Sequence, residues 1–573
     1  MIESPDFDQD RRRRRRGGVG DVAQNAGVLV AVATDGGTGR DAGGWLRPIA
    51  EDGTPAGEAT HVPDLAAAVS ARESAEAPRW AWASTAGLYP RLLRAGVQVR
   101  RCQDLELTEA LLLGHDGRWG EPRSLAALVA RLRGAPVPPD LDTGTAPPGQ
   151  ETLFDDLPPP AVLRDAENPV DAIWTGYADQ RGRIGLTAHP QRFRLLVAVE
   201  SAGALAAAEM GRIGLPWRAD VHDDLLTELL GPNPPGGGMP PRLVGLKEKI
   251  SDSFGGGPVH PESPADLLRA FSRAGIVLPS TRAWVLQGVD HPAVPSLLEF
   301  KELYRLWTAH GWSWRVQWVR DARFRPEYVP GGVVSGRWAS RGGGALQIPK
   351  VVRRAVVADE GWRLVVADAG QLEPRVLAAM AGDEGLAAAG RAGDLYRALA
   401  DEAFGGDRSR AKVALLGAMY GQTGGSAVPA LAALRARFPV AWEFVERAAR
   451  EGEGGGLVRS WLGRTCPPAD GPLSGEQARA RGRFTRNFVV QATAAEWALA
   501  LLATVRTQLP APAQLVFFQH DEIMVHSPAE LAPEVAQAVH AAGETATRLL
   551  FGETVVRFPL DVSTVDCYAD AKA

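Results

Sequence analysis

The stretch QLVFFQHDEIMVH, residues 514 to 526, places His520, Asp521 and Glu522 between two apolar runs. Two runs of β-forming residues around a polar break are typical of a β-hairpin. Carboxylates at such a break either face solvent in a turn or lie at the rim of a metal site, and charged turns are the commoner case. The stretch therefore predicts a hairpin and leaves the role of its carboxylates open.

The composition is typical of a soluble globular protein with more than one domain. The chain has 573 residues, of which 45% are hydrophobic and 23% are charged. Its net charge of −5 gives no global attraction to nucleic acid, so any polyanion site must be a local basic patch. Cys102, Cys466 and Cys567 are widely scattered and form neither a disulfide framework nor a zinc site. We expect no stretch to be long and apolar enough to cross a membrane. The scattered cysteines fit a reducing cytoplasm.

The first third of the chain predicts an α/β domain. Residues 1–25, with the arginine run Arg11–Arg16, read as a disordered tail to which no function is assigned. In residues 26–190 the runs VLVAVAT, RWAWAS and VQVRRC predict strands between helical patterns. A Pro/Gly-rich segment, residues 137–160, predicts an exposed loop.

The rest of the chain is first mostly helical and then mixed. LLVAVESAGALAAAEM, SPADLLRAFSRAG and PSLLEFKELYRLW predict helices between residues 190 and 320, with a loop at GPNPPGGGMPP. Strands and helices mix beyond residue 330, and the 514–526 hairpin is followed by a helical pattern over 528–550.

Asp368 ends an apolar strand pattern in RLVVADAGQLEPRVLAAMAGD, residues 363–383. An Asp at the end of a strand lies at an edge that a ligand can reach. The alternative is that Asp368 caps the helix that follows, a role for which Asp is well suited.

The segment DRSRAKVALLGAMYG, residues 407–421, predicts a helix with Asp407 as its N-cap. Side chains four residues apart form a stripe along one face of a helix. Two cations, an aliphatic side chain and an aromatic ring in that order suit a ligand with phosphates at one end and a flat base at the other. A surface helix with a few basic residues is the alternative. The stripe consists of Arg408, Lys412, Leu416 and Tyr420.

Two further segments carry basic and amide side chains. SGRWASRGGGALQIP and VVRRA, between residues 335 and 355, place arginines among glycines, where they can contact phosphates. RGRFTRNFVVQATAAEW, residues 481–497, begins basic and continues as an amphipathic helix, although such residues are more often merely exposed. The candidates are Arg337, Arg341, Arg353 and Arg354 in the first segment and Arg483, Asn487 and Gln491 in the second.

In this order the segments resemble the motifs of family A DNA polymerases, the bacterial DNA polymerase I group. ADAGQLEPRVLAAMAGD is similar to motif A, RSRAKVALLGAMYG to motif B and QHDE to motif C. SGRWAS resembles the arginine motif that precedes motif A, and LLEFKELYRLW resembles the thumb helix. The resemblance covers residues 190–573. It implies an α+β multidomain protein in which a right-hand polymerase, with a thumb at about 200–330 and palm and fingers at about 331–573, follows an α/β ribonuclease H-like, exonuclease-type domain.

The resemblance also implies the chemistry. A template-directed DNA polymerase, acting in repair or replication, joins deoxynucleoside triphosphates to a primer with two Mg²⁺ ions, and such hard cations prefer carboxylate oxygens. Strict strand alternation would turn Asp521 toward the metals, and His520 and Glu522 away from them. The resemblance implies that Asp368 and Asp521 are the metal ligands and that Glu522 is a supporting catalytic residue. It implies that Glu373 lies against a ribose 2′-hydroxyl in a nucleotide site made of Arg408, Lys412, Leu416, Tyr420, Glu373 and Gln371. The residues that it implies for contact with primer–template DNA are Arg337, Arg483, Asn487, Gln491 and His520.

Three departures from the family pattern affect the nucleotide site. Leu416 stands where the family usually has an aromatic residue, and Ala369 and Gly370 replace an aromatic and a hydroxyl residue after the aspartate. The segment after SGR is shortened to ALQIP. Because the aspartate pair and the Arg/Lys/Tyr helix are intact, we expect activity with altered sugar discrimination and fidelity.

The N-terminal domain resembles the family's proofreading exonuclease but lacks its carboxylates. VLVAVATDGG has no Asp-x-Glu, and WASTAGLYPRLL lacks the expected aspartate, so Asp104 and Asp179 remain as isolated acids. Two Mg²⁺ ions cannot be held without a ligand set. We therefore expect a structural domain without proofreading, and no separate 5′-nuclease domain.

The loop segment GQETLFDDLP carries Gln150, Leu153 and Phe154 in a Q-x-x-L-F spacing. This resembles the short peptide by which bacterial replication proteins dock on the sliding clamp, where two apolar side chains fill a pocket. The alternative is that Leu153 and Phe154 anchor the loop on its own domain.

Two other functions compete with polymerisation: an active 3′–5′ exonuclease, and a degenerate protein that grips primed DNA without synthesis. The first is disfavoured by the missing carboxylates and the second by the intact aspartate pair. We expect a monomer in the cytoplasm, associated with the nucleoid.

Overall fold

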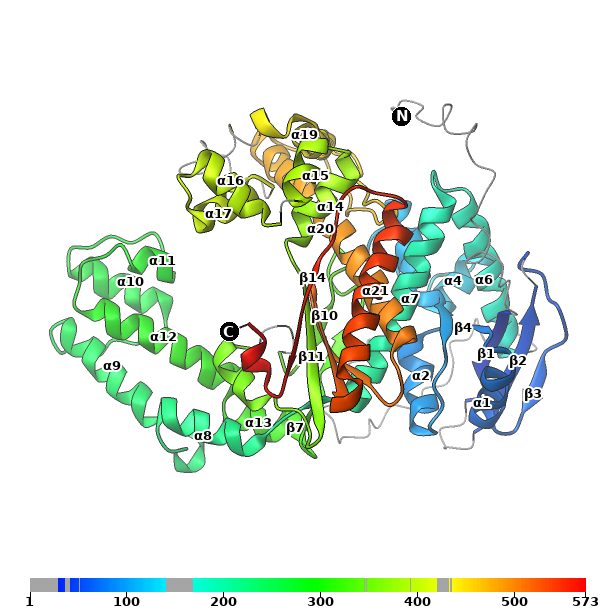
Figure 1. Ribbon diagram of the computed structural model, residues 1–573, viewed down its shortest axis with the longest axis horizontal. Helices are drawn as coiled ribbons and strands as arrows, with labels where there is room; N and C mark the ends of the chain where they lie inside the picture. Colours follow the sequence, from blue (N-terminus) through cyan, green and yellow to red (C-terminus); the bar gives the residue numbers. More distant parts are fainter. Residues whose placement is uncertain are drawn as a thin grey trace.

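The computed structural model describes residues 29–36, 42–50, 52–140, 168–344, 346, 348–391, 393–419, 432 and 435–572. The Arg11–Arg16 tail, Tyr420 and the clamp-peptide candidates Gln150, Leu153 and Phe154 lie outside these residues. Figure 1 shows a helical arm on one side, a sheet in the centre with a group of helices above it, and an N-terminal domain on the other side.

The N-terminal domain is built on a mixed sheet with the order β3-β2-β1-β4-β5, in which β1 runs antiparallel to β2 and parallel to β4. Val30 and Val32 of β1 pack toward α1, α2 and α7, whereas Ala31 and Ala33 pack toward α6. The alternation explains why both faces of this strand are apolar. The elements are β1 (Leu29–Thr34), β2 (Gly44–Ile49), β3 (Thr60–Val62), α1 (Leu65–Glu76), β4 (Arg79–Trp82), α2 (Thr85–Arg94), β5 (Arg101–Asp104), α3 (Leu105–His115), α4 (Leu125–Leu132) and α6 (Pro169–Gly185).

The strands predicted at VLVAVAT and RWAWAS are confirmed as β1 and β4. The strand expected over VQVRRC lies later, at Arg101–Asp104. Val97 and Val99 are buried, but they belong to the connection from α2 to β5. Their apolar character therefore reflects packing and not strand structure.

The helical arm follows α7 (Pro190–Ile213) and consists of antiparallel helices (Figure 1). Leu297, Phe300 and Leu303 recur every three residues on α12 and are buried, since this face packs against α9. Residues 215–355, which form the arm and its connection to the central sheet, contain β6 (Leu215–Pro216), α8 (Ala219–Leu230), η1 (Pro235–Gly237), α9 (Pro241–Ser253), α10 (Pro264–Arg273), α11 (Ala283–Leu286), α12 (Ala293–His310), α13 (Trp312–Trp318), β7 (Val319–Arg320), β8 (Arg323–Phe324), β9 (Glu327–Val329), β10 (Ala339–Arg341) and η3 (Lys350–Ala355).

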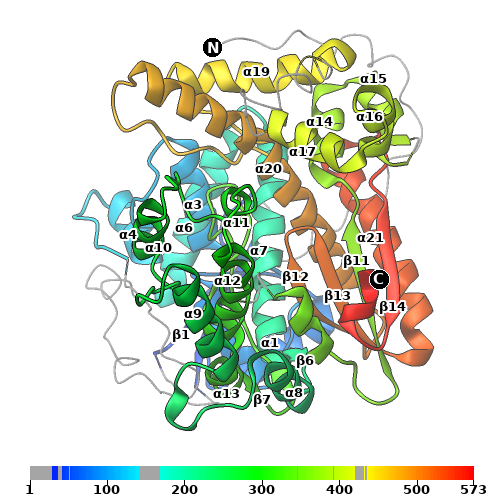
Figure 2. The same cartoon turned by 90° about the vertical axis from the view of Figure 1, so that its left-hand side faces the viewer.

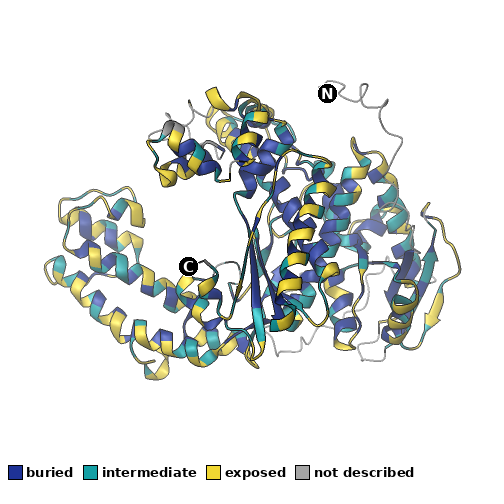
Figure 3. Ribbon diagram, in the orientation of Figure 1, coloured by how far each residue is buried: buried dark blue, intermediate teal, exposed yellow. Residues whose placement is uncertain are grey.

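The central sheet is antiparallel with the order β12-β13-β11-β14. The predicted hairpin is confirmed, because β12 (Gln514–Gln519) and β13 (Glu522–Pro528) pair directly across the turn. Its strands are mostly buried in Figure 3, and α20 and α21 lie beside it. The other elements are β11 (Trp362–Ala369), η5 (Ala529–Leu531), α21 (Ala532–Phe551), β14 (Leu560–Val565) and η6 (Tyr568–Lys572).

The distal helices α14 to α19 lie above one end of this sheet (Figure 2). Asp407 accepts a hydrogen bond from the backbone N–H of Arg410 at 2.9 Å, so its predicted capping of the next helix is confirmed. The elements are α14 (Leu372–Ala381), α15 (Glu384–Arg391), α16 (Leu395–Ala403), α17 (Arg408–Met419) and α19 (Pro439–Glu453).

Helix α20 (Gly475–Gln508) is 34 residues long and runs through the protein from the distal helices to the N-terminal domain (Figure 2). The expectation that no stretch is long and apolar enough to cross a membrane is wrong, since this helix passes that test with a mean hydropathy of 1.6 over 18 residues. In the structure 83% of that window is buried. The apolar character of α20 is therefore explained by its place in the core.

Glu496 on α20 carries a fully buried carboxyl group that forms hydrogen bonds with the loop around residues 460–462. It accepts hydrogen bonds from the Ser460 hydroxyl and, at 3.1 Å, from the backbone N–H of Leu462. Burial raises the pKa of Glu496 to about 7, although these hydrogen bonds and Arg464 oppose the shift.

The raised pKa predicts a pH-dependent stability. The stability that Glu496 contributes is fully present below its unfolded pKa of about 4.5 and is lost as the pH rises through 7. Between pH 4.5 and pH 8 the unfolding free energy of the wild type should therefore fall by about 3 kcal/mol relative to that of Glu496→Gln, which has no carboxyl group to ionise at this position. Urea denaturation at both pH values measures the difference. The exposed Glu544→Gln variant should show no such change, and a constant difference for Glu496→Gln would contradict the prediction.

Candidate active site

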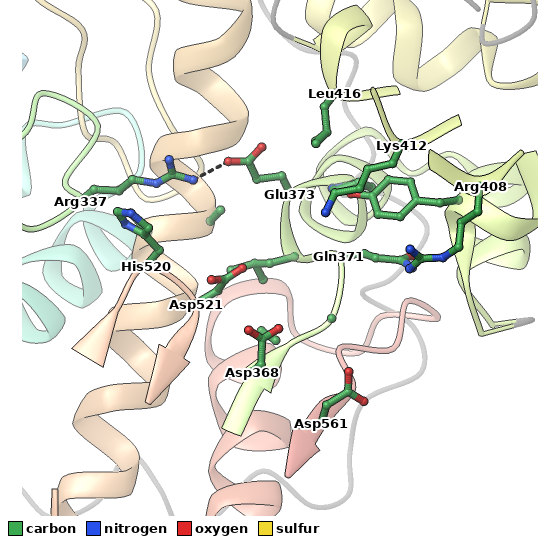
Figure 4. Close-up of a pocket in the computed structure, with 17 residues that line it drawn as sticks. Arg337, Asp368, Gln371, Glu373, Arg408, Lys412, Leu416, His520, Asp521 and Asp561 are labelled. Carbon is green, nitrogen blue, oxygen red and sulfur yellow. Dashed lines mark hydrogen bonds and ion pairs between the residues drawn. The ribbon is translucent and has the colours of Figure 1, made fainter. Parts of the chain in front are cut away.

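A pocket of about 510 Å³ lies where the central sheet meets the distal helices. It collects side chains from β11, the turn between β12 and β13, α16, α17, α20 and β14, as Figure 4 shows in close-up. Segments separated by more than 150 residues thus meet at one site. Of the residues predicted from the sequence, the pocket is lined by Arg337, Asp368, Gln371, Glu373, Arg408, Lys412, Leu416, His520 and Asp521.

The two predicted metal ligands are brought together at the sheet. Asp368 is near the end of β11, and Asp521 lies in the turn between β12 and β13. The backbone N–H of Ala369 donates to the carbonyl oxygen of Asp521 at 3.0 Å and ties the two segments to each other. Asp368 is not a helix cap, since α14 begins at Leu372 and is preceded by Gln371 at its N-cap. The capping alternative is therefore wrong, and the ligand role of Asp368 remains a prediction.

The expected orientation of His520 is wrong. Alternation along a strand would turn this side chain away from Asp521, but His520 lies in the turn with a φ of +57° and lines the same pocket. Burial and the nearby Arg337 charge lower the pKa of His520. A neutral imidazole is consequently favoured beside the two aspartates.

Glu522 lies behind the pocket. It is 4% exposed, pairs in register with Asp368 across β13 and β11, and is not among the residues that line the pocket. Burial and the carboxylate of Glu522 raise the pKa of Tyr568. This position fits a supporting role better than direct contact with a ligand.

The helical stripe predicted from the sequence reaches the pocket. Arg408, Lys412 and Leu416 lie along α17 and line it together. Arg408 also pairs with Asp394, the N-cap of α16, through its Nε atom. Two cations and an aliphatic side chain therefore form one wall, opposite the aspartates (Figure 4).

Glu373 forms an ion pair with Arg337 across the pocket, with 2.5 Å between a guanidinium nitrogen and Oε1 (Figure 4). Gly336 precedes this arginine with a φ of +80°, and a Cβ atom there would lie 2.4 Å from the Nε atom of Arg464. Only glycine fits this close approach. The SGR segment is thus held against the buried Glu200–Arg464 pair and projects Arg337 into the pocket.

Gln371 lines the pocket, but both ends of its amide are already engaged. Its Nε2 donates to Asp394 at 2.5 Å, and its Oε1 accepts from the backbone N–H of Leu395 at 2.9 Å. Its φ of +57° makes it one of the non-glycine residues in the left-handed region. Such conformations persist only where the surroundings hold them, and here Gln371 anchors the start of α16 beside the pocket.

The predicted DNA-contacting residues of α20 form a row that leads to the pocket. Arg483 is exposed, while Asn487 and Gln491 are partly exposed. They follow one another every four residues, and the next step of four is Ala495, which lines the pocket. The row therefore lies on the helix face that continues into the pocket wall.

Two polar side chains that line the pocket, Asp561 and Tyr396, were not predicted from the sequence, and neither were the apolar Leu372, Pro374, Ala494 and Ala495. Asp561 on β14 is paired in register with Asp368 on the neighbouring strand. The alternating pattern LDVSTV signals a strand, but the register with β11 depends on the tertiary fold. Tyr396 lies in the first turn of α16, and nothing in its local sequence indicates a ligand.

The carboxylates of Asp368 and Asp521 suit Mg²⁺. Magnesium is usually held in proteins by one or two carboxylates together with water and substrate phosphates. Among the described residues no cluster of three or more His, Cys, Asp or Glu side chains is arranged to hold a metal by itself. In a site built on two carboxylates, water molecules and the phosphate oxygens of a ligand would complete the coordination of Mg²⁺.

In the N-terminal domain the two isolated acids have structural partners. Asp104 accepts hydrogen bonds from the backbone N–H groups of Thr85 at 2.6 Å and Leu107 at 2.9 Å, and so holds the starts of α2 and α3. Burial raises the pKa of Asp104 to about 6. Asp179 pairs with Arg183 at 3.4 Å. The absence of a nuclease site remains a prediction.

The sequence profile of DNA polymerase family A matches residues 242–565, which is more than half of the chain. The chain belongs to this family. The matched range falls within residues 190–573, for which the motifs predicted it, and it includes both aspartates and the cation-bearing α17.

Curated relatives that match this family A chain are DNA polymerase I proteins. This chain is 30% identical over 238 residues to the DNA polymerase I of Chloroflexus aurantiacus, and the match covers 36% of this chain and 25% of the relative. It is 29% identical over 289 residues to the thermostable enzyme of Thermus aquaticus, covering 45% and 35%. The chain thus spans between about a quarter and a third of the length of these relatives.

A solved structure gives the fold. The POL domain of Pol1 from M. smegmatis, in a complex with DNA primer-template and dNTP, matches with a TM-score of 0.72 over 96% of this chain and 97% of that domain. The sequences are 20% identical. The family A polymerase fold therefore extends over nearly the whole chain.

Proposed function

We propose that this chain is a template-directed DNA polymerase that adds deoxynucleotides to a primer 3′ end, in DNA repair or replication. The observation that carries the proposal is the pocket in which Asp368 and Asp521 face the cations of α17. Membership of the family supports it, and the DNA polymerase I relatives make synthesis on a primed template the natural reaction.

In the proposed mechanism each wall of the pocket has its own task. Arg408 and Lys412 bind the triphosphate of the incoming nucleotide, since guanidinium and ammonium groups form strong hydrogen bonds to phosphate. Asp368 and Asp521 would hold two Mg²⁺ ions, which would supply positive charge to stabilise the attacking and leaving oxygens. Tyr420 would close over the base and sugar, and Glu522 would support the aspartates from behind.

The ion pair between Arg337 and Glu373 would lie next to the sugar of the incoming nucleotide. Glu373 would then reject a ribose 2′-hydroxyl, because its carboxylate is held in place by Arg337. With Leu416 in place of an aromatic residue, the nucleotide loses a stacking surface, which supports altered sugar discrimination. Gln371 would contribute to nucleotide binding indirectly, because it holds the start of α16 beside the pocket.

The primer–template would lie along α20 and between the helical arm, as the thumb, and the distal helices, as the fingers. Arg337, Arg483, Asn487, Gln491 and His520 would contact it, with the two arginines binding phosphates. A clamp contact through Gln150, Leu153 and Phe154 is a separate proposal that rests on the Q-x-x-L-F spacing alone. We further propose a monomer in the cytoplasm, associated with the nucleoid.

Primer extension tests the proposal. A labelled primer annealed to a template is incubated with the protein and Mg²⁺, with and without deoxynucleoside triphosphates. We expect lengthening that depends on nucleotides and on Mg²⁺, and no shortening when nucleotides are omitted. Shortening would identify an active 3′–5′ exonuclease. Bound DNA without either change would mean that the chain grips primed DNA and does not synthesise.

A further inference from the structure

Three arginines lie together at the edge of the N-terminal sheet where β4 and β5 begin. Arg79 and Arg101 are the first residues of these parallel strands and are paired in register. Trp80 and Cys102, the next residue of each strand, pack into the core beside α2 and α7. Successive side chains of a strand point to opposite faces, so Arg79 and Arg101 lie side by side on the other face of the sheet. Arg100 directly precedes Arg101 and is exposed.

The positive charges of this arginine cluster repel one another. Like charges directly opposite on neighbouring strands are destabilising. Burial and the charges of Arg79 and Arg100 lower the pKa of Arg101, against the effect of Glu73. Both oxygens of Glu73 already accept hydrogen bonds from uncharged donors, namely Trp80 Nε1 at 2.6 Å and the backbone N–H of Arg100 at 2.8 Å. Glu73 is therefore one carboxylate beside three guanidinium groups.

Most hydrogen-bond donors of the cluster are unused within the part of the chain that the structure describes. Arg101 donates from Nη2 to the carbonyl oxygen of Ala77 at 3.1 Å, while its buried Nε has no partner there. The guanidinium groups of Arg79 and Arg100 form neither an ion pair nor a hydrogen bond with any described residue. Even Glu76, which is exposed at the end of α1, does not pair with them. The cluster can thus offer several donors to a ligand.

The cluster lies outside the pocket. Arg506, near the end of α20, donates to the carbonyl oxygen of Arg100 at 2.9 Å. Between Ala495, which lines the pocket, and Arg506 the helix rises by about 17 Å. A phosphate bound by the cluster would therefore belong neither to an incoming nucleotide nor to a primer end in the pocket.

Phosphate is the anion that suits a group of arginines. The guanidinium group is always charged, is weakly hydrated and presents a planar fork of donors that matches phosphate oxygens. The net charge of −5 gives the protein no general attraction to nucleic acid, so contact with a DNA backbone depends on local clusters of this kind. Duplex DNA presents one phosphate charge for about every 1.7 Å of its axis, which allows several guanidinium groups to be engaged at once.

We propose that Arg79, Arg100 and Arg101 form a phosphate-binding site on the N-terminal domain, which holds a DNA backbone outside the pocket. Bound phosphate would remove the repulsion between the paired arginines. The inference goes beyond the proposed function, because DNA can be held here whether or not the pocket synthesises. Arg101 also serves the fold through its bond to Ala77, so Arg79 and Arg100 are the residues with which the site is tested.

The test removes the two arginines that have no partner among the described residues. Arg79→Gln/Arg100→Gln is compared with Arg118→Gln/Arg181→Gln, which removes two arginines of the same domain that already have partners on the protein. Both double variants change the net charge equally. The dissociation constant of a labelled primer–template duplex is measured by fluorescence anisotropy at several KCl concentrations and without nucleotides.

The salt dependence reports the number of phosphate contacts. Each contact that is lost lowers the slope of log affinity against log salt by about 0.9, so Arg79→Gln/Arg100→Gln should lower it by about 1.8 and weaken binding about tenfold at about 0.1 M KCl. The control should keep the slope. Arg79→Lys/Arg100→Lys retains both charges and should keep it too. In primer extension the kcat of Arg79→Gln/Arg100→Gln should stay within about twofold of the wild type at saturating DNA, because the cluster lies outside the pocket.

Each other outcome has a distinct meaning. Unchanged affinity and slope in Arg79→Gln/Arg100→Gln would overturn the inference, and so would an equal loss in the control, which would assign the effect to net charge. A titration with inorganic phosphate at constant ionic strength separates a small anion from DNA. If phosphate binds through these arginines while DNA affinity does not depend on them, the assignment to DNA is wrong. Arginine-dependent DNA binding without any extension would sustain the inference and overturn the proposed polymerase.

The fold of each variant is checked by thermal unfolding. The melting temperature of Arg79→Gln/Arg100→Gln should be unchanged or raised, because the substitution relieves the repulsion on Arg101. Where this double variant proves unstable, Arg100→Gln alone takes its place, since this side chain is exposed, and the slope should then fall by about 0.9.

Discussion

Asp521→Ala is expected to abolish primer extension, with a loss in rate of at least about a thousandfold. Asp521 is one of the carboxylates that line the pocket, and its removal would take away a ligand of the proposed Mg²⁺ ions. Metal stabilisation of developing charge contributes several kcal/mol to a phosphoryl-transfer barrier, and each 1.4 kcal/mol changes the rate about tenfold. The rate is measured as single-nucleotide incorporation with saturating primer–template.

The matched control is Glu530→Ala, which removes an exposed carboxylate just beyond the same hairpin. It should extend the primer as the wild type does. Both variants should bind primer–template with similar affinity, so that a loss in Asp521→Ala reports chemistry and not folding. Retention of more than a tenth of the wild-type rate by Asp521→Ala would remove this residue from the proposed metal site.

Arg506→Leu is expected to lower the free energy of unfolding by about 3 to 5 kcal/mol. Arg506, on α20, donates to both carboxylate oxygens of Glu209 on α7, at 2.8 and 2.6 Å. It also donates to the carbonyl oxygens of Val99 and Arg100 in the N-terminal domain. Both side chains are largely buried, so the variant leaves an uncompensated charge on Glu209. Urea denaturation followed by circular dichroism measures the change.

A double variant separates the ion pair from packing. Arg506→Leu/Glu209→Leu removes both charges and should recover much of the loss, since a buried pair replaced by apolar side chains is often nearly neutral. Arg450→Leu breaks the exposed pair with Glu443 and should cost less than about 1 kcal/mol. If the double variant is as unstable as Arg506→Leu, the loss does not come from an unpaired charge.

The features that could be predicted from the sequence are those in which residue types repeat every two or every four positions along the chain. The hairpin around Asp521, the strand that carries Asp368 and the stripe on α17 follow from alternation and from spacings of four, and each is found in the structure. The family resemblance then joined them into one site. Tyr420, which should complete the stripe, lies outside the described residues.

The features that the sequence could not predict depend on contacts between distant segments. His520 turns into the pocket because a two-residue turn breaks the alternation of the flanking strands. Asp561 reaches the site through the register of β14 on β11, and Arg337 meets Glu373 only when the SGR segment folds back over Arg464. No local pattern encodes these approaches.

Helix α20 limits how this protein can be shortened. At a rise of about 1.5 Å per residue, its 34 residues span about 50 Å, from the row that begins at Arg483 past the pocket to Arg506. A truncation that removes the N-terminal domain and keeps residues 190–573 would leave Arg506 without Val99 and Arg100, and would expose Leu205 of α7, which packs into the N-terminal domain. Such a shortened chain would keep the pocket residues and gain an exposed apolar surface, so we expect poor solubility that polar substitutions along that face would correct.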